Sequence, residues 1–109
     1  MAYSEELAEQ IRELVFERPD VSERKMFGGV AWMLSGNLAV GVNGDRLMVR
    51  LSHEDVEAAL AEPHVGPMDF TGKTMRGFIT VEPEGLGDEE DLAGWVDAGA
   101  DFAASLPPK

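Results

Sequence analysis

In three successive runs within residues 30–51, every second position is Val, Leu or Trp. A period of two is the side-chain repeat of a β-strand. Short segments at 35–37 and 43–45 separate the runs, and each contains Asn and Gly, which tolerate the positive φ of tight hairpin turns. This pattern predicts an antiparallel meander of three strands.

Helical periodicity replaces the alternation on both sides of the meander. A helix is expected over residues 4–18, capped by Ser4 and ended by Pro19. Ser52, with Asp55 three residues later, predicts the start of a short helix that runs to about residue 61. A last helix is expected over 88–106, with an apolar stripe formed by Leu92, Trp95, Val96, Gly99, Phe102, Ala103 and Leu106.

Two further strands are expected, at 23–27 and 77–82, with an irregular segment at 63–76 between the second helix and the last strand. Grouped strands with helices outside them indicate an α+β fold and not a doubly wound parallel sheet. We therefore expect one domain, residues 1–109, built as a two-layer α/β sandwich. Its antiparallel sheet has four to five strands with the helices packed on one face, against Val30, Trp32, Leu34, Val40, Val42, Val49, Leu51 and Val81.

The reverse face of this sheet is unusually apolar for a surface that faces solvent. It is expected to carry Ala31, Met33, Ala39, Gly41, Met48 and Phe78 beside Arg46 and Arg50. Two explanations stay open: a partner subunit covers this face, or segment 63–76 of the same chain does. The first explanation makes the protein a homodimer candidate, with an interface formed by Met33, Arg46, Met48 and Phe78.

The formal net charge of −12 disfavours direct contact with nucleic acid or anionic lipid. The absence of cysteine removes disulfides and thiolate chemistry. The acidic N-terminus lacks the apolar core of a signal peptide, and no apolar run approaches the roughly 18 residues of a membrane span. A cytoplasmic protein without membrane contact is expected.

Three segments resemble the N-terminal domain of the TfoX competence-regulator family. They are KMFGGVAWM at 25–33, DRLMVR at 45–50 and PMDFTGKTMRGF at 67–78. The resemblance extends over residues 5–105 and implies a two-layer fold of the secretion-chaperone-like type. Competence regulators of this family add a C-terminal domain, whereas this sequence ends at residue 109. We therefore expect a stand-alone N-terminal domain, to which the family's role in competence does not transfer directly.

The basic residues of the middle of the chain suggest a second kind of site. Backbone amides beside adjacent glycines can hold an anion, and nearby cations would assist them. The candidate ligand-binding residues are Lys25, Phe27, Gly28, Gly29, Arg50, Lys73 and Arg76. Two structural alternatives stay open: the glycines form a β-bulge, and the cations pair with surface acids. The spacing fits neither a Walker loop nor a dinucleotide fingerprint.

No arrangement of nucleophile, base or metal ligands in the sequence indicates an enzyme, and we expect no cofactor. The favoured hypothesis is a regulatory protein-interaction module that binds a protein partner or itself. The alternative is a binder of a small anion or nucleotide through the basic residues near Gly28 and Gly29. Nucleic-acid binding and catalysis are the weaker hypotheses.

Overall fold

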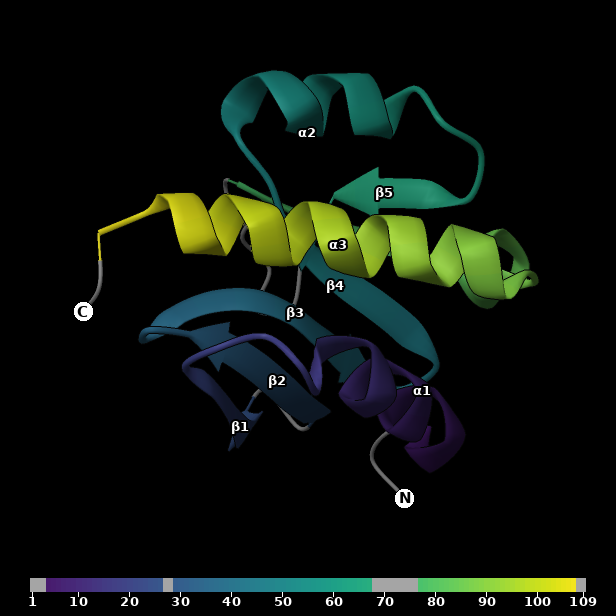
Figure 1. Ribbon diagram of the computed structural model, residues 1–109. Helices are drawn as coiled ribbons and strands as arrows, with labels where there is room; N and C mark the ends of the chain where they lie inside the picture. Colours follow the sequence, from purple (N-terminus) through teal and green to yellow (C-terminus); the bar gives the residue numbers. More distant parts are fainter. Residues whose placement is uncertain (1–3, 27–28, 68–76, 108–109) are drawn as a thin grey trace.

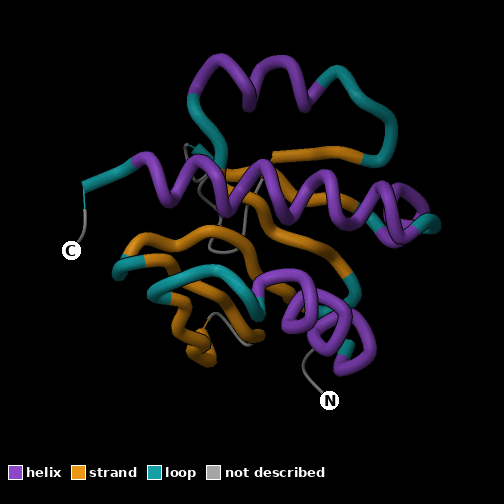
Figure 2. Tube along the Cα trace, in the orientation of Figure 1, coloured by secondary structure: helices purple, strands orange, loops and turns teal. Residues whose placement is uncertain are grey.

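The computed structural model describes residues 4–26, 29–67 and 77–107 (Figures 1 and 2). Six strands form one sheet in the order β1-β2-β3-β4-β6-β5, and every neighbouring pair is antiparallel. The elements are, in chain order, α1 (Glu5–Val15), β1 (Val21–Met26), β2 (Gly29–Leu34), β3 (Asn37–Asn43), β4 (Arg46–Arg50), α2 (His53–Leu60), β5 (Val65–Pro67), β6 (Phe78–Val81), the 3-10 turn η1 (Pro83–Leu86) and α3 (Glu89–Ser105).

The α+β fold and the antiparallel meander are confirmed, but the sheet is larger than the expected four to five strands. The additional strand is β5, which lies in the segment expected to be irregular and pairs with β6 at one edge of the sheet. The first helix was expected to reach residue 18 but ends at Val15. Phe16 follows the helix directly and is 82% exposed.

The helix starts follow from local capping. The Ser4 hydroxyl accepts a hydrogen bond from the Leu7 amide, and the Ser52 hydroxyl accepts one from the Asp55 amide. These bonds satisfy amides that have no partner within the helix. Asp88 precedes α3 without such a bond, and acidic residues fill the first turn of that helix, where they suit the positive end of the helix dipole.

The core lies between the sheet and the helices. α3 packs on β2, β3 and β4, α1 packs beside α3, and α2 lies over β5 and β6 (Figure 1). The expected apolar sheet face is buried against these helices, including Trp32 at 1% exposure. Gly99 lets α3 approach closely, because a Cβ there would lie 2.6 Å from the Ala39 carbonyl oxygen.

A β-bulge changes the expected facing of one residue. Trp32 pairs with Val40, whereas Met33 pairs with Leu38, so Ala39 is an extra residue on β3. Ala39 was expected on the reverse face, but it packs with Leu34, Ala100 and Ala103 on the helical side. Because of the bulge, Ala39 packs against the second half of α3.

Candidate functional site

The chain itself buries the centre of the reverse sheet face. Ala31 is 0% exposed, Met48 1% and Thr80 3% in a structure of a single chain. Met48 lies close to Gly41, where a Cβ would come within 2.4 Å of the Met48 methyl carbon. A partner subunit is therefore not needed to explain the apolar character of this face. Residues 68–76, part of the segment suggested as its cover, lie outside the described residues.

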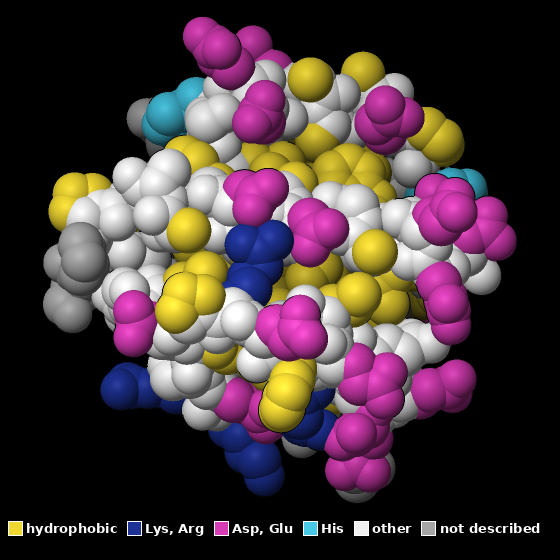
Figure 3. All heavy atoms as spheres, in the orientation of Figure 1, with side chains coloured by type: hydrophobic (Ala, Val, Ile, Leu, Met, Phe, Trp, Pro, Cys, Tyr) yellow, Lys and Arg dark blue, Asp and Glu magenta, His cyan; other side chains and the backbone are white. Residues whose placement is uncertain are grey.

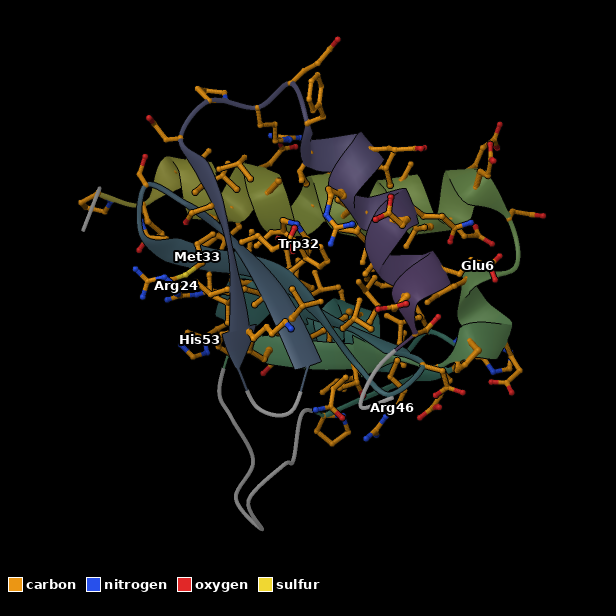
Figure 4. The ribbon with its side chains drawn as sticks, turned by 90° about the horizontal axis from the view of Figure 1, so that it is seen from below. Glu6, Arg24, Trp32, Met33, Arg46 and His53 are labelled. Atoms are coloured by element: carbon orange, nitrogen blue, oxygen red, sulfur yellow. The ribbon has the colours of Figure 1, made fainter. Side chains whose placement is uncertain are left out.

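The remaining interface candidates are half-buried and spread over the sheet. Met33 pairs with Leu38 at the start of β3, whereas Arg46 pairs with Asn43 at its end. Five residues of strand separate these positions by about 17 Å, and Figure 4 shows the two side chains at opposite ends of the sheet. Self-association stays a prediction, which light scattering of the intact chain tests.

The described members of the anion-site hypothesis do not converge. Lys25 on β1 pairs with Val30 on β2, which pairs with Val42 on β3, which in turn pairs with Leu47 on β4. Three interstrand spacings therefore separate the backbone of Lys25 from β4 by about 14 Å. Arg50 is three residues beyond Leu47 on β4, which adds about 10 Å along the strand. Phe27, Gly28, Lys73 and Arg76 lie outside the described residues.

Arg50 and Gly29 have evident structural roles. The Arg50 guanidinium carbon lies 5.7 Å from the centroid of the Phe78 ring and 5.8 Å from that of Phe102, within the range of cation–π attraction. Arg50 therefore links the end of β4 to α3. A Cβ at Gly29 would lie 1.8 Å from the Val42 carbonyl oxygen, so this glycine permits close strand pairing.

The Glu23 carboxyl lies in a network of hydrogen bonds that lowers its pKa. Hydrogen bonds from the Arg12 guanidinium, 2.7 and 2.9 Å long, hold the pKa of the Glu23 carboxyl below its ordinary value of 4.5, against an opposing effect of burial. The Trp32 indole N–H donates to the same carboxyl over 3.0 Å. This network connects α1, β1 and the core residue Trp32. The ion pair between Arg12 and Glu23 is partly exposed, and we interpret it as a structural contact between α1 and β1.

An open groove runs along α3 and is bounded on its other side by α2, by residues 62–64 that follow α2, and by η1. We call it the groove between α2 and α3. Its two hollows, of about 540 and 340 Å³, share the lining residues Glu62, Trp95 and Ala98. The smaller hollow, of about 340 Å³, is also lined by Leu51, Ala58 and Ala59, which form an apolar floor. Figure 3 shows hydrophobic side chains along the bottom of this groove, between the two helices.

Acidic side chains surround the groove. The described residues that line it include five carboxylates and no Lys or Arg: Asp55, Glu62, Glu84, Glu90 and Asp91. His64 is the single other titratable side chain among them. The site therefore combines an apolar floor with a negative rim, a composition that suits a partner with apolar and basic groups.

Sequence reasoning missed this groove because it placed Trp95 on the buried stripe of α3. The Trp95 side chain is only half-buried, since α2 stands away from α3 at that point. The signal available in the sequence was weak: the small residues Gly94 and Ala98 lie next to Trp95 on the surface of α3. The spacing between two helices is not encoded in the periodicity of either.

Within residues 4–26, 29–67 and 77–107, no group of three or more His, Asp and Glu side chains is arranged to hold a metal ion. No helix in the same ranges is both long and apolar enough to cross a bilayer.

Comparison with known protein families identifies the family of this chain. The family model described as the TfoX N-terminal domain matches residues 13–103, which include every strand, α2 and most of α3. The chain belongs to the TfoX N-terminal domain family. No curated protein and no solved structure was found to match. In this TfoX N-terminal domain, the groove between α2 and α3 falls wholly within the matched residues.

Proposed function

We propose that this chain is a regulatory protein-interaction module, which acts by holding another protein on its helical side. The family supports a competence-related regulatory role at the level of the family as a whole. The open groove between α2 and α3 carries the proposal for this particular chain. An exposed apolar floor inside a polar rim is a recurring composition of protein-binding surfaces.

The charge of the molecule favours a protein over a nucleic acid as the partner. A formal net charge of −12 repels phosphate backbones. The outer side of α3 adds Asp97 and Asp101, which pair with Arg18 over 3.2 and 3.0 Å. A regulator with such a surface would influence transcription through another protein and not through its own contact with DNA.

The test replaces an exposed alanine in the groove and a matched one outside it. Ala58 lines the groove on α2, and Ala104 is an exposed alanine near the end of α3 that does not line it. In the organism that encodes the chain, transcript profiles are compared for the wild type, a deletion strain, and strains that carry Ala58→Arg or Ala104→Arg. Immunoblots establish that both variants accumulate.

We expect the deletion to change a defined set of transcripts and Ala58→Arg to reproduce that change, while Ala104→Arg behaves as the wild type. An unchanged profile in the deletion strain would contradict a regulatory role. Full activity of Ala58→Arg would contradict the use of the groove. If Ala58→Arg fails to accumulate, the exposed pair Glu62→Lys and Asp91→Lys makes the same test through charge alone.

A further inference from the structure

We propose that the groove between α2 and α3 binds a short basic segment of a partner protein, with one apolar side placed on the floor of the groove. This inference rests on the proposed function and adds the chemistry of the partner. Five carboxylates and no Lys or Arg are among the described residues that line the groove. Lys and Arg on the segment would therefore meet opposite charge along the whole rim.

The dimensions of the groove suit a short segment. Its lining on α3 runs from Glu90 to Ala98, which spans about 12 Å at the helical rise of 1.5 Å per residue. About two helical turns, or four residues of extended chain, fill that length.

The floor has space for an apolar side chain. A Cβ added at Gly94 would meet nothing within 4 Å, so the wall of α3 is open at that point. The half-buried Trp95 ring and Ala98 lie beside this opening. Both also line the adjoining hollow, to which α2 contributes Ala58. A hollow of about 540 Å³ is within the usual range of ligand sites. One large apolar side chain, with Trp95 as its contact, therefore fits here.

A second copy of this chain is the less suitable occupant. Each copy carries a formal net charge of −12, with 21 acidic residues against nine Lys and Arg. Two such copies repel each other as they approach. The acidic rim of the groove would add to this repulsion wherever another acidic surface met it. A basic segment from a different protein removes the repulsion and benefits from electrostatic steering.

Trp95 provides a direct readout of occupancy. The protein contains two tryptophans, and Trp32 is buried at 1% exposure. A Trp32→Phe variant therefore reports on Trp95 alone. The probe is a synthetic ten-residue peptide with leucines at helical spacing and lysines elsewhere. Control peptides replace every Lys by Glu, or every Leu by Ser.

The Leu/Lys peptide is expected to shift Trp95 emission to shorter wavelength in a saturable manner, and the Leu/Glu peptide to leave it unchanged. Ala58→Arg should weaken binding by about tenfold or more, equivalent to about 1.4 kcal/mol, while the matched Ala104→Arg binds as the parent does. The Ser/Lys peptide should bind more weakly than the Leu/Lys peptide, because charge alone lacks the apolar contact. Anisotropy of a labelled Leu/Lys peptide on the wild-type chain repeats the test without the Trp32 substitution.

Equal binding to Ala58→Arg and Ala104→Arg would overturn the inference, as would equal binding of the Ser/Lys and Leu/Lys peptides or an unchanged Trp95 spectrum with every peptide. The proposed function fails separately, when deletion of the chain leaves transcripts unaltered. If Ala58→Arg abolishes regulation in cells but no basic peptide binds, the groove has a partner of different chemistry and this inference alone is wrong.

Discussion

Gly94 and Gly99 both belong to α3 but have opposite surroundings. A Cβ at Gly99 would lie 2.6 Å from a backbone oxygen of β3, whereas a Cβ at Gly94 would meet nothing within 4 Å. We expect Gly99→Ala to lower the free energy of unfolding by about 1–3 kcal/mol through overpacking. Gly94→Ala should raise it by about 0.4–1 kcal/mol, since alanine restricts the unfolded chain. Urea unfolding followed by circular dichroism measures both, and equal effects of the two substitutions would contradict the close packing of α3 on β3.

Glu23 should make the stability of the protein depend on pH. Its pKa is lowered in the folded state by the Arg12 hydrogen bonds, so its stabilisation is present above the unfolded value of 4.5. That stabilisation is lost as pH falls through the folded pKa. The stability difference between wild type and Glu23→Gln should therefore shrink between pH 6 and pH 3 in urea unfolding.

The matched control for this pH series is Glu57→Gln, which changes an exposed carboxylate on α2. Its difference from the wild type should vary less over the same pH range. A Glu23→Gln difference that stays constant with pH would show that the contact between Arg12 and Glu23 contributes no pH-dependent stability.

Single residues mark how far the sequence predicts this structure. Alternation predicts that Trp32 and Val40 face the helices, because strand facing is a local property. Alternation predicts the wrong face for Ala39, because a β-bulge shifts the register of β3 at that residue. Helical periodicity predicts that Trp95 is buried, but it is half-buried, because its exposure depends on the position of α2, which no local pattern determines. The groove was therefore not predictable, although the helices that form it were.

At the scale of elements, α2 is the helix with the least support from the core. Ala59 is its single buried residue, whereas α1 buries four residues and α3 five. The Ser52 cap should therefore determine how often α2 opens. Ser52→Ala should cost about 1 kcal/mol, which speeds amide hydrogen exchange in α2 about fivefold if α2 opens locally.

Amides of α1 in the same Ser52→Ala sample serve as the internal control for the exchange measurement. They should change little, because α1 has its own cap at Ser4. Equal acceleration in both helices would mean that α2 opens only with the whole molecule. Local opening would instead make α2 an adjustable wall of the groove.

The meander and the three helices were predictable because each carries its own periodicity and turn or cap residues. β5 was not, since it is three residues long and contains Gly66 and Pro67. Its strand character comes from pairing with β6, more than ten residues later along the chain. Short edge strands of this kind depend on the assembled sheet.

At the scale of the whole molecule, an antiparallel sheet carries three helices on one side, and the gap between two of them is apolar and acid-rimmed. The central claim is that this gap faces a protein partner. The most direct measurement places a photo-crosslinking amino acid at position 58, and in a second strain at position 104, and identifies crosslinked peptides from living cells by mass spectrometry. The account predicts that position 58 alone links to a defined partner, at a segment rich in Lys and Arg. Crosslinks of equal yield from position 104, or none from position 58, would contradict it.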